Sequence, residues 1–156
     1  MPAKPIDSKK ILARNRKAFH DYHIVDSWEA GIVLLGPEVK SIRAGRVTLQ
    51  DAFGRVQGNE VWLHGMHVSP YDPASRWNVE PDRPRKLLLH RGQIRRLIGA
   101  TQEKGLTLVL LDVYLQDGKI KTTLALARGK KLHDKRETER RREADREIER
   151  AVRSVR

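Results

Sequence analysis

Histidine is the residue type in this sequence best suited to bind a metal ion or to move a proton, and the chain contains six of them. His20 and His23 are three residues apart, and so are His64 and His67. This spacing places two side chains on one face of a helix but not on one face of a strand. The residues around both pairs are typical of strands, and no cluster of carboxylates accompanies them. We therefore expect no metal site and no bound cofactor.

Signatures of other enzyme classes are missing from the sequence. His20-Asp21 and His133-Asp134 resemble the dipeptide of metal-dependent phosphohydrolases, without the further His and Asp residues that such sites require. The absence of cysteine excludes disulfides, thiolate zinc sites and cysteine nucleophiles. The chain has no GxxxxGKS/T phosphate loop, no GxGxxG fingerprint and no GxSxG elbow. We expect a protein that is not an enzyme and has no small-molecule substrate.

Two groups of basic residues are better candidates for a functional surface. Asn15-Arg16-Lys17 precedes His20-Asp21-Tyr22, so donors to phosphate lie close to rings that can stack on bases. Arg85-Lys86 stands directly before the apolar Leu87-Leu88-Leu89. A further residue, Glu29, is acidic and precedes an apolar run, where its carboxylate can orient a cation that touches RNA. These patterns favour binding to RNA or DNA.

The distribution of charge agrees with a polyanionic partner. The net charge is +12, of which residues 1–19 contribute +5, residues 20–128 contribute +3 and residues 129–156 contribute +4. A nearly balanced body thus carries two basic ends, which suits nucleic acid. No apolar run approaches the roughly 18 residues that span a membrane, and the first residues lack the apolar stretch of a secretory signal. We expect a soluble, cytoplasmic protein.

The elements that must position these residues are mainly strands. We predict about six short strands, at residues 24–25, 30–35, 46–53, 60–68, 106–115 and 119–127, with a hairpin turn at Asp117-Gly118. Helices are expected from Ser8 through Leu12, over 38–44 and over 93–104, and an extended loop over 69–85. This pattern is typical of an OB-fold-like antiparallel β-barrel with short accessory helices. We assign the barrel to residues 15–128 and a flexible basic segment with a short helix to residues 1–14.

The remaining residues, 129–156, form a basic tail of different character. They include no aromatic residue. Opposite charges fall three or four residues apart in Glu137–Arg141, Glu143–Arg146 and Glu149–Arg153. Each such pair adds about 0.2–0.5 kcal/mol to a helix, which is too little to hold an isolated helix firmly. We expect a tail that is disordered when free and helical against a partner, with a permanently solvated helix as the alternative.

Read in order, these segments resemble the SsrA-binding protein family, also called small protein B or SmpB. The similarity runs from about residue 15 to residue 136. It is carried by Asn15-Arg16-Lys17-Ala18 with His20-Asp21-Tyr22, Glu29-Ala30-Gly31-Ile32, Glu38-Val39-Lys40-Ser41 with Arg43-Ala44-Gly45, Arg85-Lys86-Leu87-Leu88-Leu89-His90, Lys104-Gly105-Leu106-Thr107-Leu108, and Gly129-Lys130-Lys131 with His133-Asp134-Lys135-Arg136.

The resemblance implies an OB-like barrel without enzymatic activity that acts in bacterial ribosome rescue. Family members bind the tRNA-like domain of transfer-messenger RNA (tmRNA) and carry it to stalled ribosomes. The resemblance also implies elongation factor Tu as a partner in the delivery complex. The body stands in for the missing anticodon arm, and the tail enters the empty mRNA channel near the decoding centre. On the ribosome the tail would be helical.

The matched segments and the basic groups together define two sets of site residues. The expected tmRNA-binding set is Asn15, Arg16, Lys17, His20, Tyr22, Glu29, Lys40, Arg43, Arg85, Lys86, Leu88, Leu89 and Lys121. The set expected to act on the ribosome is Gly129, Lys130, Lys131, His133, Asp134, Lys135 and Arg136.

Two positions depart from the family pattern. Pro37 stands where relatives often have Thr, and the tail lacks the aromatic residue found in some relatives. The alternative function is a general ribosomal or single-stranded nucleic-acid-binding OB-fold protein, which would also be basic. A small nuclease or phosphohydrolase that requires His20 is a third class.

Overall fold

The described part of the chain comprises residues 9–71 and 79–154 of a computed structural model. Its strands are β1 (Lys9–Arg14), β2 (Tyr22–Ile32), β3 (Val47–Thr48), β4 (Phe53–Gln57), β5 (Glu60–His64), β6 (His67–Val68), β7 (Arg85–Leu88), β8 (Leu106–Gln116) and β9 (Lys119–Gly129). Its helices are α1 (Arg16–Asp21), α2 (Gly36–Arg43), α3 (Arg91–Ala100) and α4 (Leu132–Ser154).

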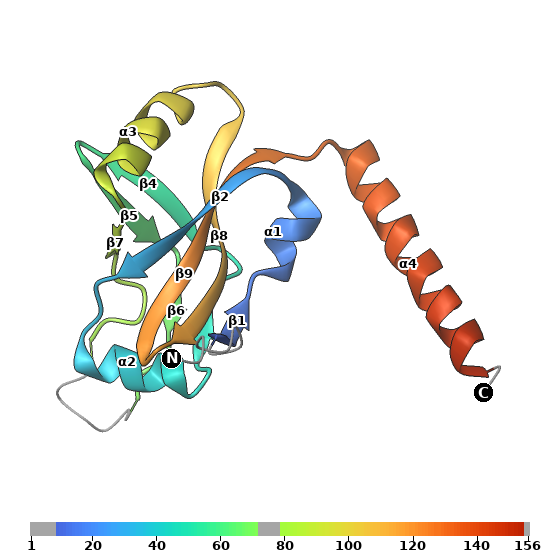
Figure 1. Ribbon diagram of the computed structural model, residues 1–156, viewed down its shortest axis with the longest axis horizontal. Coiled ribbons are helices and arrows are strands. Elements are labelled where there is room, and N and C mark those ends of the chain that lie inside the picture. The colour runs from blue at the N-terminus through green and yellow to red at the C-terminus, as the bar shows by residue number, and fades with distance from the viewer. Residues whose placement is uncertain (1–8, 72–78, 155–156) are drawn as a thin grey trace, which may run out of the picture.

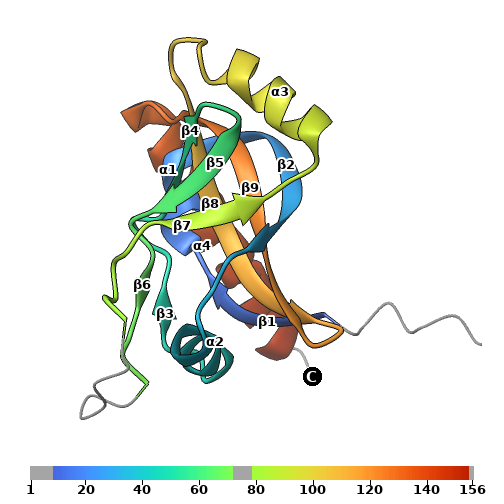
Figure 2. The same ribbon diagram turned by 90° about the vertical axis from the view of Figure 1, so that its left-hand side faces the viewer.

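Six strands close into a barrel. The large antiparallel sheet has the order β1-β8-β4-β5-β7-β2-β9, and an additional β8–β9 pairing closes the ring. β1 lies outside the ring on the edge of β8 that β4 leaves open. α2 and α3 lie at opposite ends of the barrel, and α4 projects away from it (Figures 1 and 2). The mainly β, OB-like fold expected from the sequence is confirmed.

The long β8–β9 hairpin follows directly from its turn. Asp117 and Gly118 both have positive φ, 50° and 76°, which is the backbone of a two-residue hairpin loop. β2 pairs with the other side of β9 from Tyr22 to Gly31, so β9 runs between two long neighbours. The three strands thereby hold side chains from distant parts of the sequence in fixed register.

The barrel interior supplies the main hydrophobic stabilisation. Leu108 and Leu110 of β8, Leu124 of β9, Leu63 of β5 and Leu87 of β7 are all buried in one cluster. A second, smaller cluster seats α1 on the outside of the β8–β9 hairpin and contains Ala18, Val109, Leu111, Ala125 and Ala127. Burial of these apolar surfaces holds α1 and the start of β2 against the barrel.

The N-terminal helix predicted from Ser8 through Leu12 is wrong, because residues 9–14 form strand β1. Ser8 itself lies outside the described residues. β1 pairs with residues 112–116 of β8, and backbone hydrogen bonds to that free edge outweigh a weak local helix signal. This is a tertiary effect that local sequence does not encode.

Two other predicted strands differ from the structure. Residues 46–53 are divided into the short β3 and the start of β4, with Leu49 and Ala52 between them turned into the core. Residues 60–68 are divided at Gly65, where φ is 75° and a Cβ atom would lie 2.2 Å from the Asp51 carbonyl oxygen. Conversely, residues 24–25 and 30–35 belong largely to one strand, β2, which continues through the polar residues between them.

The tail is a 23-residue helix, α4, whose described side chains are largely exposed. Two apolar side chains, Ile148 and Val152, remain 62% and 58% exposed. The disorder expected of the free tail stays a prediction. Among the helices of the described residues, none has the length and apolar character needed to cross a membrane.

Candidate nucleic-acid interface

Three strands bring a glutamate, a tyrosine and a lysine side chain together at the barrel surface. The Tyr114 hydroxyl on β8 donates to Glu29 Oε2 on β2 at 2.7 Å, and Lys121 Nζ on β9 donates to Glu29 Oε1 at 2.5 Å. Lys9 Nζ lies 4.1 Å from the centre of the Tyr114 ring. The hydrogen bonds from Lys121 and Tyr114 hold the pKa of Glu29 below its ordinary value. Glu29 is therefore ionised at neutral pH and fixes the direction of the Lys121 ammonium group.

An apolar groove adjoins this cluster. Gly31 on β2 is the register partner of both Leu88 on β7 and Lys121 on β9, so these residues stand side by side. A Cβ atom at Gly31 would lie 3.2 Å from the Cβ of Leu88, so glycine lets the leucine cover the strand. Leu88 is 52% exposed, and with Val39 of α2 it lines a hollow of about 340 Å³. Lysine, carboxylate and exposed leucine thus meet at one place, which we call the Glu29 cluster.

The cationic residue Arg85 lies in the interior instead of on this surface. Arg85 is 1% exposed, and its guanidinium donates to Glu38 Oε2 and to the carbonyl oxygens of Met66 and Pro81. Arg83 also donates to Glu38. Burial acts to raise the pKa of Glu38, but the hydrogen bonds from the two arginines and a backbone N–H outweigh it and lower the pKa. Three donor groups of Arg85 are thus used inside the protein, and the RNA contact expected of it stays a prediction.

Asn15 is also buried, and its side chain stabilises the local structure. Its side-chain oxygen accepts from the Ala18 N–H at 3.1 Å and caps α1. Its Nδ2 donates to the Leu49 and Leu110 carbonyl oxygens, each at 2.9 Å. Asn15 is 3% exposed, and the RNA contact expected of it likewise stays a prediction.

The α1–β2 junction is tied to the base of α4. His20 Nδ1 lies 2.9 Å from Asp21 Oδ1, and His20 Nε2 lies 2.8 Å from Glu139 Oε1. Lys135 Nζ lies 3.4 Å from Asp21, and Lys130 Nζ donates to Thr138 at 2.9 Å. His20 is thus engaged within the protein, in a contact that we call the α4 latch. The hydrogen bonds to Asp21 and to Glu139 raise the pKa of His20, and its bond to Asp21 lowers the pKa of that carboxyl.

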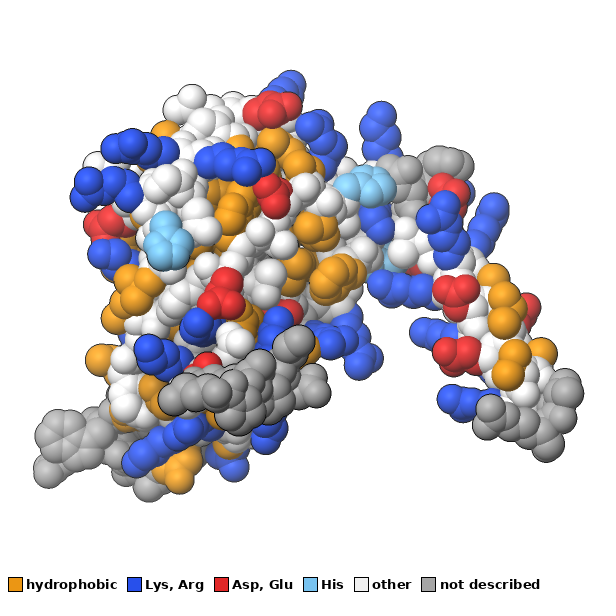
Figure 3. All heavy atoms as spheres, viewed as in Figure 1, with side chains coloured by type: hydrophobic (Ala, Val, Ile, Leu, Met, Phe, Trp, Pro, Cys, Tyr) orange, Lys and Arg blue, Asp and Glu red, His pale blue; other side chains and the backbone are white. Residues whose placement is uncertain are grey.

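Other expected basic residues are distributed over the surface. Lys40 lies 5.4 Å from the centre of the Tyr71 ring, and Lys86 forms a 2.7 Å ion pair with Glu60. Six of the expected residues are exposed: Arg16, Lys17, Arg43, Gly129, Lys131 and Arg136. Four are partly buried: Tyr22, Leu89, Lys130 and Lys135. The side chains of His133 and Asp134 lie outside the described residues. Figure 3 shows lysine and arginine on the barrel and along α4.

Comparison with known proteins decides the family. The sequence profile described as SmpB protein matches residues 12–154 of this chain. The chain belongs to the SmpB family. It is 57% identical over 146 residues to the SsrA-binding protein of Carboxydothermus hydrogenoformans, covering 94% of this chain and 98% of the relative. It is 55% identical over 149 residues to the SsrA-binding protein of Bacillus subtilis, covering 96% of each chain.

A solved structure agrees with this family. A chain of "tmRNA-SmpB: a journey to the center of the bacterial ribosome" matches with a TM-score of 0.68 and 47% identity. The match covers 83% of this chain and 94% of the other. SmpB proteins bind RNA and are not enzymes, so the expectation of a non-enzyme is confirmed.

The SmpB residues expected to bind tmRNA fall into two separate surfaces. Tyr22 begins β2 opposite Gly129, whereas Gly31 stands at its other end opposite Lys121. Nine residues of strand separate the two positions by about 30 Å. Lys17 and Tyr22 therefore belong to a different surface from Glu29 and Leu88.

Two residues of the Glu29 cluster were missed by sequence reasoning. Tyr114 and Lys9 reach Glu29 only because β8 pairs with both β9 and β1. The usable signal is the tyrosine in a strand rich in Leu and Val, since a buried tyrosine needs a partner for its hydroxyl. In the described residues no group of three or more His, Cys, Asp or Glu is placed to hold a metal ion.

Proposed function

We propose that this chain binds the tRNA-like domain of tmRNA and brings it to stalled ribosomes in trans-translation. The observation that carries the proposal is the convergence of Glu29, Lys121 and Leu88 from three strands. The family resemblance implies tmRNA binding at these positions. Relatives at 55–57% identity are SsrA-binding proteins, and the structural match contains tmRNA and SmpB.

The geometry of the Glu29 cluster suits folded RNA. Lys121, whose side chain is 30% exposed, presents its ammonium group in a direction fixed by Glu29. It can therefore meet a phosphate with little loss of side-chain freedom. The exposed Leu88 offers an apolar surface beside it to an unstacked base or a ribose. Such a surface recognises RNA through its shape, its phosphates and its unstacked bases. It does not read a base sequence in a helical groove.

On the ribosome, we propose that the two parts of the chain act separately. The barrel takes the place of the anticodon arm that tmRNA lacks, and residues 129–136 and the rest of the tail enter the empty mRNA channel near the decoding centre. The exposure of α4 and the net charge of +4 over residues 129–156 support this assignment, because basic residues can replace the counterions of the surrounding RNA. Delivery together with elongation factor Tu and a cytoplasmic site of action complete the proposal.

Replacement of Lys121 tests the proposed interface. We expect Lys121→Ala to weaken binding to the tRNA-like domain at least about tenfold in a gel-shift assay, because a charge-assisted contact is lost. Glu29→Ala should also weaken binding, since it leaves Lys121 unoriented and removes the acceptor of Tyr114. Lys104→Ala is the matched control, because it removes one exposed positive charge beyond α3, away from the cluster.

Two outcomes would contradict the proposal. One is an equal loss of affinity in Lys121→Ala and Lys104→Ala, which would assign binding to net charge alone. The other is equally effective competition by bulk tRNA or single-stranded RNA against the wild-type complex. That result would favour a general nucleic-acid-binding OB protein.

A further inference from the structure

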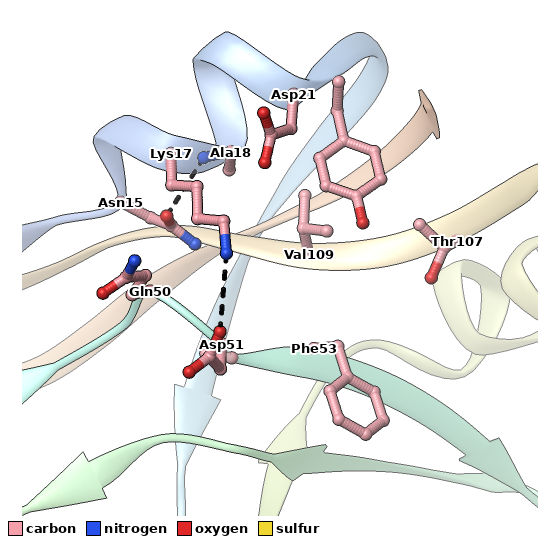
Figure 4. Close-up of a pocket in the computed structure, with 11 residues that line it drawn as sticks. Asn15, Lys17, Ala18, Asp21, Gln50, Asp51, Phe53, Thr107 and Val109 are labelled. Carbon is pink, nitrogen blue, oxygen red and sulfur yellow. Dashed lines mark hydrogen bonds and ion pairs between the residues drawn. The ribbon is translucent and has the colours of Figure 1, made fainter. Parts of the chain in front are cut away.

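A second hollow lies at the end of β2 remote from the Glu29 cluster. Its volume is about 300 Å³, and it is enclosed by α1, the start of β2, the residues that lead into β4, and the start of β8. Figure 4 shows the side chains that line it, which project from these four segments. Apart from Asn15, Lys17 and Tyr22, no residue of its lining belongs to the sets expected from the sequence. We call it the Phe53 pocket.

An aromatic side chain is held at the wall of this pocket. The Phe53 ring stacks on the ring of its cross-strand partner His64, with centroids 5.4 Å apart and an angle of 17° between the planes. Phe53 is nevertheless 42% exposed, so much of a large apolar ring faces solvent. The pocket floor is formed by the buried Ala18 and Val109, and Tyr22 adds a second aromatic ring to the lining. An exposed ring fixed in orientation is a surface on which a planar group can stack.

The rest of the lining is polar and hydrogen-bonding. Gln50 offers an amide, Asp51 a carboxylate and Thr107 a hydroxyl. Lys17 Nζ lies 3.8 Å from Asp51 Oδ1 at the mouth, and both side chains are at least half exposed. The lining has two carboxylates, and both are paired within the protein: Asp21 with His20 and Lys135, and Asp51 with Lys17. This arrangement does not suit a metal ion. A ring for stacking, mixed donors and acceptors, and a nearby ammonium group together match the base and phosphate of one nucleotide.

We propose that the Phe53 pocket binds one unpaired nucleobase of a structured RNA. The base stacks on Phe53, its edge contacts Gln50, Asp51 or Thr107, and its phosphate lies beside Lys17. This proposal rests on the proposed function in one respect, that the ligand is RNA. The base can come from tmRNA or from ribosomal RNA. About 30 Å of strand separates the pocket from the Glu29 cluster, so one RNA surface can engage both or two RNAs can bind at once.

A mononucleotide titration of the full chain tests the pocket directly. Followed by NMR, guanosine 5′-monophosphate should shift the signals of Tyr22, Phe53 and Thr107, while those of Leu88 and Lys121 should change little. Ribose 5-phosphate, which has the phosphate but no base, should leave the pocket signals in place. Equal shifts with both compounds would reduce the site to a phosphate contact and overturn the proposal.

Binding of large RNAs identifies the source of the base. Phe53→Ala should lower the affinity for the tRNA-like domain of tmRNA, or for vacant ribosomes, at least about fivefold, since stacking on an aromatic residue is lost. Phe19→Ala is the matched control, because Phe19 is similarly exposed, at 44%, and does not line the pocket. Phe53→Trp keeps a ring and should retain binding.

The effect of Phe53→Ala on the two affinities, for tmRNA and for ribosomes, identifies the RNA that supplies the base. Loss for tmRNA alone assigns the base to tmRNA, and loss for ribosomes alone assigns it to ribosomal RNA. Unchanged affinity for both, relative to Phe19→Ala, would overturn the proposal. Lys121→Ala acts at the other end of β2, so failure of the proposed tmRNA interface and failure of the Phe53 pocket give different results.

Discussion

Two acid–base pairs of similar chemistry differ in function because one is exposed and the other is buried. The side chains of Glu29 and Lys121 are 50% and 30% exposed, and such surface pairs contribute about 0–1 kcal/mol to stability. Those of Glu38 and Arg85 are 4% and 1% exposed. A buried charge that loses its partner is costly, because nothing replaces the lost solvation. The first pair is thus free to serve binding, whereas the second holds α2 against the strand that carries Leu88.

Removal of the buried arginine should unfold the protein more easily. We expect Arg85→Ala to lower the free energy of unfolding by about 3–5 kcal/mol, because Glu38 loses its buried partner and keeps only the more exposed Arg83, and the Met66 and Pro81 carbonyl oxygens lose their donor. Urea denaturation measures this change. Lys86→Ala is the control, since the neighbouring Lys86 pairs with Glu60 at the surface and should cost less than about 1 kcal/mol. A similar loss in both variants would contradict the assigned difference.

Only part of the site could be predicted at the level of single residues. Glu29, Leu88 and Lys121 were found by resemblance, and the structure places them together. Arg85 and Asn15 have the side chains of RNA-binding residues, but both are buried. Burial depends on which strands become neighbours, and no local pattern in the sequence reports it.

At the level of elements, a helix or strand can be predicted when the residues that determine it are close to it in the sequence. The β8–β9 hairpin depends on residue types that favour strands and on the turn at Asp117-Gly118, which are local, so it could be predicted. β1 depends on an open edge of β8, about a hundred residues away in the chain. Its own sequence, with Ile11 and Leu12 after Ser8, is compatible with a helix. Elements of this second kind need the tertiary structure.

The contact between α1 and α4 should respond to pH. Its two anionic neighbours raise the pKa of His20, so the protonated ring favours the packed arrangement. This stabilisation is complete below the ordinary histidine pKa of about 6.5 and is lost as the pH rises through the raised value. We therefore expect Glu139→Gln to lower the pKa of His20 in an NMR titration of the imidazole signals. It should also speed amide hydrogen exchange at the start of α4 in mildly acidic solution.

The control for the α4 latch lies on the same helix. Glu143→Gln removes the same charge from an exposed position of α4. It should leave the pKa of His20 close to the wild-type value. A similar fall in both variants would show that the helix acts through its total charge and not through the His20–Glu139 contact.

At the level of the whole molecule, most of the net charge of +12 lies in the two end segments of the chain. The barrel residues 20–128 carry only +3, while the two end segments carry +5 and +4. β1 and α1 return the N-terminal charges to the barrel, whereas α4 carries its charges away from it (Figure 1). The fold therefore separates the cations beside the barrel surfaces from those of the tail. Each group can bind a different RNA, and salt should weaken both interactions.

This separation predicts that binding of tmRNA and action on the ribosome can be lost independently. Alanines at Asp134, Lys135 and Arg136 should leave affinity for the tRNA-like domain within about twofold of wild type, because the Glu29 cluster is untouched. The same variant should abolish tagging of stalled products in a reconstituted translation assay. Lys121→Ala should show the opposite pattern. Its affinity for tmRNA should fall, but tagging should be restored when the protein concentration is raised. Equal loss of tmRNA affinity in both variants would mean that the tail and the barrel form one binding surface.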